Sequence, residues 1–221
     1  MTTAIIGVGH IGKTLGEHFV AGGERVVLAA RDQADAARVA SELGELDSAA
    51  SAASVADAIA QADVVVLAVM LDVIRDLVPR YADALEGKVV IDPSNPVALD
   101  DAGNLYRTLP EDESAASVVA GLLPAGAHYA KAFGTLLATS WQSAANRTPR
   151  RAVLFYATDD EQAAAVVERL IRAAGFDPVK VGGVSEAARI EAGGDLSQAG
   201  GLNGRLLDAD QARAALAPAT V

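Results

Sequence analysis

The sequence predicts an α/β fold built on a doubly wound parallel sheet, and three observations lead to this prediction. Apolar runs alternate with alanine-rich stretches along most of the 221 residues, which is the order of strands and helices in such folds. Two of the runs, VVVLAV and VVI, are apolar without interruption, as expected for strands that helices cover on both faces. A cluster of glycines directly follows the first apolar run.

The expected elements follow one another in a regular order. Seven runs of apolar, strand-forming residues are expected to form strands: Thr3–Val8, Arg25–Ala29, Val64–Met70, Lys88–Asp92, His128–Phe133, Ala152–Tyr156 and Pro178–Val181. Seven intervening or following stretches, most of them rich in alanine, are expected to form helices: Ile11–Ala21, Gln33–Leu43, Val55–Gln61, Val73–Leu85, Glu113–Leu122, Glu161–Ala174 and Ser185–Glu191.

Two stretches interrupt this order. Residues Pro93–Asp112 form a long polar connection after a strand, and long connections in compact domains often have a function. Residues Ala192–Gly204 are dominated by glycine and alanine, so we expect an irregular surface segment there. No linker divides the chain. We therefore expect one domain over residues 1–221, with a short α-helical C-terminal part from about residue 157 to residue 221.

The composition narrows the class of protein. Hydrophobic residues make up 51% of the chain, enough for a large core, yet no apolar run approaches the roughly 20 residues of a membrane-spanning helix. The net charge of −11 argues against nucleic-acid binding, which usually needs a basic surface. The absence of cysteine excludes disulfides, thiolate metal sites and thiol nucleophiles. The chain enters its first strand without a signal-type segment, so we expect a cytoplasmic protein that binds no membrane.

The glycine cluster has the spacing G-x-G-x-x-G between a strand and a helix. Gly7 permits a tight turn, Gly9 lets the backbone approach a pyrophosphate, and Gly12 allows close packing of helix on strand. His10 and Ile11 lie at the helix start, where free backbone N–H groups and the helix dipole favour an anion. In this context the motif predicts a Rossmann-like, dinucleotide-binding fold.

The end of the second strand selects between NADP and NAD. Arg31 is placed to pair with the 2′-phosphate of NADP. Asp32 is the competing feature, because a carboxylate there would accept the ribose hydroxyls of NAD, or else cap the next helix. A solvated Arg31 is the remaining alternative. The sequence favours NADP. Val69 and Met70 end the VVVLAV strand, at the edge where the cofactor is expected, although both also suit the core.

Five segments of the chain resemble one family. They are GVGHIGKTLGEHFVAGGERVVLAAR, ADVVVLAV, VVIDPSNP, LLPAGAHYAKAFGTL and GGVSEAARIE, and the last three occur in an order that ordinary dinucleotide-binding domains do not have. The chain is similar to the NADP oxidoreductases that depend on coenzyme F420, a family that includes the reductase domains of the STEAP metalloreductases. Relative to that family, the chain has Asp35 where lysine is common and Gly134 where asparagine is common.

The resemblance implies where the second substrate binds. The nicotinamide end of the cleft would be formed by the loop of Ser94, Asn95 and Pro96 and by the segment of Phe133, Gly134 and Thr135. The alternative for these residues is an ordered loop and a buried strand end. The stretch Ser185–Glu191 would close the acceptor side, or else only pack as a helix. The resemblance also implies a homodimer that pairs through the C-terminal part.

The reaction expected is direct hydride transfer, because no catalytic side chain and no metal-binding spacing is evident in the sequence. Such a reaction needs NADPH and a flat acceptor, such as coenzyme F420, FMN or FAD, stacked at close range. Two other functions stay open: reduction of a small carbonyl or imine compound, and NADP sensing without turnover. Lys131 is expected to be solvated or to approach a phosphate, and Trp141 to wall the acceptor pocket or to pack in the core.

Overall fold

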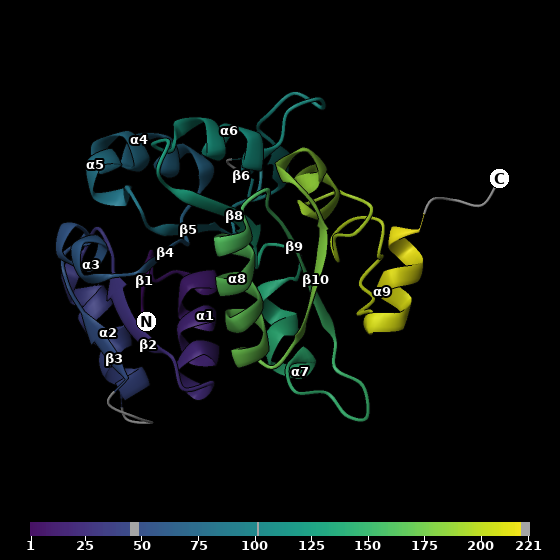
Figure 1. The fold of residues 1–221 in the computed structure, drawn as a ribbon, viewed down its shortest axis with the longest axis horizontal. Coiled ribbons are helices and arrows are strands. Elements are labelled where there is room, and N and C mark those ends of the chain that lie inside the picture. Colours follow the sequence, from purple (N-terminus) through teal and green to yellow (C-terminus); the bar gives the residue numbers. More distant parts are fainter. Residues whose placement is uncertain (45–48, 101, 218–221) are drawn as a thin grey trace.

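The computed structural model describes residues 1–44, 49–100 and 102–217, and its strands and helices alternate along the chain (Figure 1). The strands are β1 (Thr2–Ile6), β2 (Arg25–Ala29), β3 (Ala50–Ala52), β4 (Val64–Leu67), β5 (Val89–Asp92), β6 (Val97–Leu99), β7 (Leu105–Arg107), β8 (His128–Ala132), β9 (Val153–Ala157) and β10 (Asp177–Gly182). The α-helices are α1 (His10–Ala21), α2 (Gln33–Gly44), α3 (Val55–Gln61), α4 (Leu71–Arg80), α5 (Ala82–Leu85), α6 (Ala115–Leu122), α7 (Trp141–Ala144), α8 (Glu161–Ala173) and α9 (Ala209–Leu216). Two 3₁₀ helices, η1 (Ala138–Ser140) and η2 (Val184–Ile190), complete the described elements.

The main sheet has eight strands in the order β10-β9-β8-β5-β4-β1-β2-β3. The pairs from β3 to β8 are parallel, and so is the β9–β10 pair. This is the Rossmann-like, doubly wound arrangement that the sequence predicts. The β8–β9 pair is antiparallel instead, because the connection between these strands holds only η1 and the four-residue α7 and lacks a long crossover helix.

The strands alternate their side chains between two cores. Val64 and Val66 of β4 face the core under α1, α2 and α8, whereas Val65 and Leu67 face the core under α3, α4 and α6. All four are fully buried. This burial on both faces explains why the VVVL run contains no polar residue. Helices α1 and α8 lie side by side on the front face of the sheet (Figure 1).

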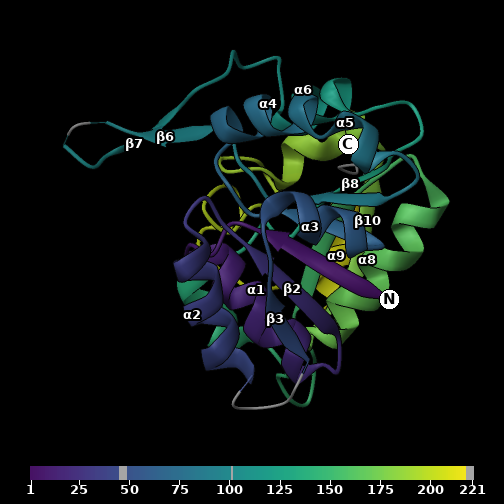
Figure 2. The same cartoon turned by 90° about the vertical axis from the view of Figure 1, so that its left-hand side faces the viewer.

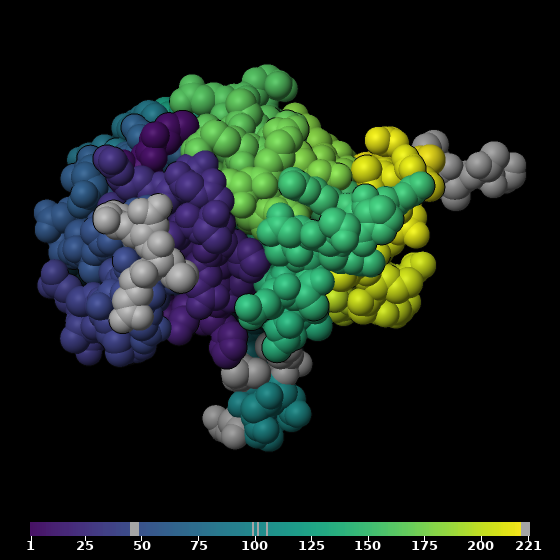
Figure 3. All heavy atoms as spheres, turned by 90° about the horizontal axis from the view of Figure 1, so that it is seen from below, coloured from purple at the N-terminus to yellow at the C-terminus, as the bar shows by residue number. Residues whose placement is uncertain are grey.

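Several local elements differ from the sequence expectation. The expected helix Val73–Leu85 is two helices, α4 and α5, which meet at Tyr81. The expected α-helix Ser185–Glu191 is the 3₁₀ helix η2. Strand β3 escaped prediction because its sequence, ASA, has no β-branched or aromatic residue. Part of the expected long connection forms the antiparallel hairpin β6–β7, which extends away from the rest of the molecule (Figures 2 and 3).

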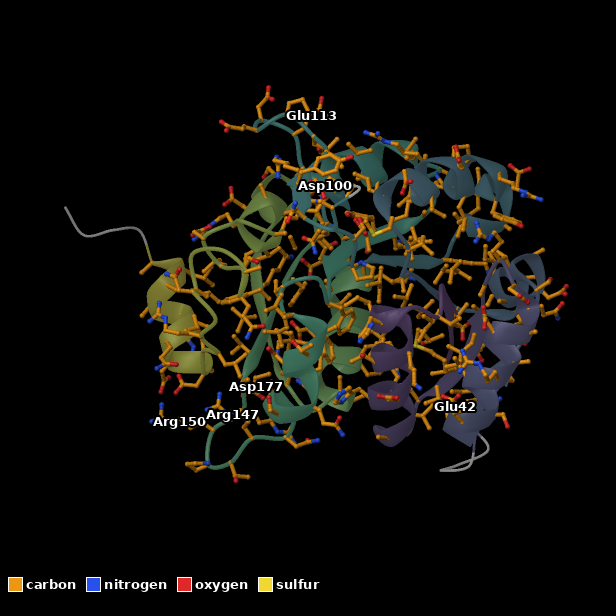
Figure 4. The ribbon with its side chains drawn as sticks, turned by 180° about the vertical axis from the view of Figure 1, so that it is seen from behind. Glu42, Asp100, Glu113, Arg147, Arg150 and Asp177 are labelled. Atoms are coloured by element: carbon orange, nitrogen blue, oxygen red, sulfur yellow. The ribbon has the colours of Figure 1, made fainter. Side chains whose placement is uncertain are left out.

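The C-terminal part contains more than helices. Strand β10 extends the sheet beyond β9, and helix α9 packs at the periphery through the buried Ala212. Arg150, in the loop before β9, holds the start of α9 through Asp208 at 3.2 Å and Asp210 at 2.9 Å (Figure 4). None of the described helices is both long and apolar enough to cross a lipid bilayer.

Candidate functional site

The glycine loop makes a tight turn from β1 into α1. Gly7 has a φ angle of +104°, a conformation that residues with a Cβ rarely adopt, and its N–H donates to the Ala29 carbonyl of β2 at 2.7 Å. A Cβ at Gly12 would overlap the Gly7 carbonyl oxygen, whereas a Cβ at Gly9 would meet no protein atom within 4 Å. The protein backbone therefore needs Gly7 and Gly12, and Gly9 leaves open space in front of the loop.

At the end of β2 the two competing side chains have different surroundings. The Asp32 carboxylate accepts a hydrogen bond from the Ala34 N–H at 2.9 Å and so caps α2. Arg31 is exposed, and within residues 1–44, 49–100 and 102–217 no hydrogen bond or ion pair engages its guanidinium. The capping role of Asp32 makes it less suited to a ribose. Arg31 remains available to an anionic ligand.

One cavity of about 350 Å³ lies where the ends of β1, β4 and β5 meet. Seven of the residues that the sequence analysis places at the cofactor cleft line it, together with three others. The lining consists of Gly9, His10, Ile11, Ala68, Val69, Met70, Pro93, Ser94, Asn95 and Val97. The Ser94 hydroxyl is buried, with no hydrogen-bond partner in the part of the chain that the structure describes. Since this hydroxyl has no accessible surface, Ser94 borders the cavity through its other atoms.

A second hollow, of about 530 Å³, begins at Gly9 and runs between α1 and α2. Lys13 and Arg38 line it, and both donate to the Glu42 carboxylate, at 2.7 and 2.8 Å. Hydrogen bonds from Lys13 and then Arg38 lower the pKa of Glu42, which lies on the side of α2 that faces α1 (Figure 4). The sequence analysis did not single out these residues.

Asn95 ties three distant segments together. Its Nδ2 donates to the Gly134 carbonyl at 3.2 Å, and its Oδ1 accepts from the Ala192 N–H at 2.7 Å. The side-chain amide thus fixes the wall of the cavity, while Asn95 still lines it. The neighbouring Pro96 is buried outside the lining, and its carbonyl accepts from the Thr108 N–H at the base of the hairpin.

The segment after β8 does not surround the cavity as expected. Phe133 has a φ of +69° and is fully buried, with its ring centroid 5.4 Å from that of Phe19 and 6.1 Å from that of Trp141. A Cβ at Gly134 would lie 2.6 Å from the Pro93 carbonyl oxygen, so this glycine permits close packing of its segment on the loop after β5. Thr135 is also buried. These three residues support the cavity from behind, because tertiary packing holds this segment in the core.

Lys131 corrects the expectation of a solvated side chain, because it is buried and its ammonium contacts protein groups. It is 1% exposed, and its Nζ lies 2.9 Å from Asp92 Oδ2, 3.5 Å from Glu191 Oε1 and within hydrogen-bond reach of the Ser94 carbonyl. The Tyr129 hydroxyl donates to Asp92 at 2.9 Å. Burial, followed by the charge of Asp92, raises the pKa of Tyr129 well above its ordinary value.

Trp141 packs in the core, and η2 reaches the site indirectly. The Trp141 ring is 1% exposed and packs against Phe133 and Phe176. Within η2, Arg189 forms an ion pair with Asp195 at 2.8 Å, so its head group is turned to a surface partner. Glu191, the residue after η2, accepts hydrogen bonds from two N–H groups at the start of α6.

Comparisons with known proteins agree with this arrangement. A model of the family described as NADP oxidoreductase, coenzyme F420-dependent, matches residues 2–96. Metalloreductase STEAP3 of Rattus norvegicus is 30% identical over 188 residues, which cover 85% of this chain and 35% of that protein. The F420-dependent NADP reductase of Methanothermobacter thermautotrophicus is 30% identical over 199 residues, 86% of this chain and 85% of that protein.

Solved structures show the same fold. A hypothetical protein from Sinorhizobium meliloti has a TM-score of 0.79 at 32% identity, covering 94% of this chain and 95% of its own. The 3-hydroxyisobutyrate dehydrogenase of Mycobacterium tuberculosis shares the fold alone, with a TM-score of 0.60 at 18% identity over 84% of this chain and 56% of its own. Since the alignment with the Methanothermobacter reductase spans most of both proteins, the chain belongs to the family of coenzyme F420-dependent NADP oxidoreductases.

Proposed function

We propose that this chain binds NADP(H) along the edge formed by the ends of β1, β2, β4 and β5 and transfers hydride between NADPH and a flavin-like acceptor such as coenzyme F420, FMN or FAD. The observation that carries the proposal is the 350 Å³ cavity, which joins the glycine loop to the Ser94–Asn95 wall. Its volume lies in the range of about 300–1,000 Å³ typical of small-molecule sites.

The adenosine half of the cofactor has a suitable cradle. The open space before Gly9 admits a pyrophosphate, which the free N–H groups of the first turn of α1 would bind. Arg31 is exposed at the end of β2, where its guanidinium would pair with the 2′-phosphate through charge-assisted hydrogen bonds. Asp32 caps α2 and does not compete for that role.

The ring end of the cavity suits a flat, apolar group. Val69, Met70, Pro93 and Val97 form apolar walls. When bound, the nicotinamide supplies a hydride to an acceptor stacked on it. The residues of the chain bind and orient the two rings, which is the main requirement of such a transfer.

His10 distinguishes the second candidate reaction. Among the described residues that line the cavity, it carries the imidazole, a side chain suited to general acid–base catalysis. Reduction of a small carbonyl or imine compound needs a proton donor, and His10 would supply that proton. Hydride transfer to F420 or to a flavin does not need a side chain that donates a proton. Because most of the cavity wall is apolar, it favours the flavin-like acceptor.

The C-terminal part has two proposed roles: to back the acceptor side of the site and to form a homodimer interface. In support of the first, the Ala192 N–H bonds Asn95, and the Gln198 N–H donates to the Thr135 carbonyl at 3.0 Å. In support of the second, Ala212 is the buried residue of α9, whose other side chains lie at least partly in solvent. A cytoplasmic location is part of the same proposal and suits a chain without cysteine.

Arg31→Ala tests the 2′-phosphate contact. We expect NADPH binding to weaken by roughly 1.5–3 kcal/mol, the range for a charge-assisted hydrogen bond, and NADH binding to change little. Calorimetric titration of both cofactors measures this difference. Arg25→Ala is the matched control, because Arg25 is an exposed arginine at the opposite end of the same strand. Equal losses for NADPH and NADH in the Arg31 variant would contradict the assignment.

Gly9→Val tests the pyrophosphate cradle. We expect binding of NADPH and of NADH to be lost, because a branched side chain would fill the space in front of the loop. Folding should be retained, since no protein atom lies within 4 Å of the added Cβ. Gly121→Val, on α6, likewise adds a side chain in open space and should leave binding intact. Unchanged affinity in the Gly9 variant would refute the cradle.

A panel of acceptors tests the reaction itself. NADPH oxidation should proceed with F420 or with a free flavin and should be negligible with small aldehydes, ketones and imines, as followed by the loss of NADPH absorbance. Turnover with carbonyl or imine compounds alone would establish the second candidate reaction. Tight NADPH binding without oxidation by any acceptor would identify a sensor and overturn the enzymatic proposal.

Light scattering tests the dimer. At micromolar concentration we expect twice the chain mass of 22.5 kDa. Truncation before Asp208, which removes α9, should shift the measured mass toward that of one chain if the interface includes this helix. A monomer in the untruncated protein would contradict the proposal directly.

A further inference from the structure

Behind the cavity lies a cluster of buried charges that hydride transfer does not use. Lys131, Asp92 and Glu191 are each at most 1% exposed. They come from β8, from the end of β5 and from the residue after η2. Buried ion pairs are seldom more stabilising than apolar residues of the same size, so their presence directly behind a candidate site points to a role other than stability.

The contacts of Lys131 lead to the wall of the cavity. Its ammonium donates to the carbonyl of Ser94, a residue that lines the cavity. Asp92 holds the other side of the same residue, because its Oδ1 accepts from the Ser94 N–H at 2.7 Å. The N–H and the carbonyl of Ser94 are thus both held by one ion pair, whose Nζ and Oδ2 atoms lie 2.9 Å apart.

The third charge connects this wall to the C-terminal part. Glu191 lies 3.5 Å from Lys131 Nζ and accepts from the Ala115 and Ala116 N–H groups at 3.0 and 2.8 Å. The next residue, Ala192, donates to Asn95. The segment after η2 is therefore bound to two adjacent residues of the cavity wall, once through the lysine and once through the asparagine.

We propose that Lys131 is a positioning residue for the nicotinamide end of the site: its buried ammonium holds the Ser94 carbonyl and Glu191 together, and thereby fixes the Ser94–Asn95 wall against which the ring binds. The inference rests on the proposed function, because it assumes that NADPH occupies the cavity. It assigns Lys131 no contact with the cofactor and no role in proton transfer.

The test compares two variants of the cluster. Lys131→Met removes the ammonium and its bond to Ser94 but keeps the apolar stem. Tyr129→Phe removes one hydrogen bond to the same Asp92 carboxylate and leaves both contacts of Ser94 intact. A purely structural cluster would make the two variants alike in ligand binding, even where both unfold at lower temperature.

Two ligands separate positioning from general damage. NADPH spans the whole site, whereas adenosine 2′,5′-bisphosphate reaches only the adenosine half. In Lys131→Met we expect both NADPH affinity and kcat, measured with the acceptor found active, to fall by about 10- to 100-fold, because the reacting group is misplaced. The affinity for the bisphosphate should stay within about twofold of wild type. Tyr129→Phe should keep both affinities.

Other results of this experiment would overturn either the positioning role or the proposed function. Unchanged NADPH affinity and kcat in Lys131→Met, or equal losses for both ligands, or the same NADPH loss in Tyr129→Phe, would overturn the positioning role. Failure of the wild-type protein to bind NADPH would instead overturn the proposed function. If the single variant does not fold, Lys131→Met combined with Glu191→Gln keeps the net charge of the cluster and is judged by the same comparison of ligands.

Discussion

The close contact between Gly12 and the carbonyl group of Gly7 is the constraint on which the rest of the structure depends. It lets α1 begin directly beside the end of β1, so that the first turn of the helix borders the cavity. The Gly7 N–H bond to Ala29 holds β2 in the same turn. The cavity, the exposed end of β2 and the open space before Gly9 all take their positions from this turn.

Much of the fold follows from local sequence patterns. The uninterrupted apolar runs predict buried strands, and the structure confirms them as β4 and β5 with helices on both faces. The glycine spacing predicts the turn into α1, which is present. For Asp32 the sequence leaves two roles open, binding the ribose of NAD or capping α2, and the hydrogen bond from the Ala34 N–H favours the cap. These features are predictable because each depends on residues close together in sequence.

The rest of the site depends on residues far apart in sequence. The resemblance implies only that Gly134 lies at the nicotinamide end of the cleft. Its contact with the Pro93 carbonyl, 41 positions earlier, exists only in the folded chain. The same holds for Asn95, whose side-chain amide donates to the Gly134 carbonyl and accepts from the Ala192 N–H. One signal was available: a lysine between two alanines of the strand HYAKA implies a buried partner, and the carboxylate that ends VVID is such a partner.

The buried charges also bear on how the sequence can change through evolution. Replacing Lys131 alone would leave two carboxylates without their cation, and replacing Asp92 or Glu191 alone would weaken the hold on that cation. A single substitution at any of the three positions is therefore expected to destabilise the fold, whereas a concerted exchange for apolar residues would spare stability but release the Ser94 carbonyl. For folding stability, a change at one of positions 92, 131 and 191 is therefore tolerated best when the other two change with it, although dozens of residues separate them in the sequence.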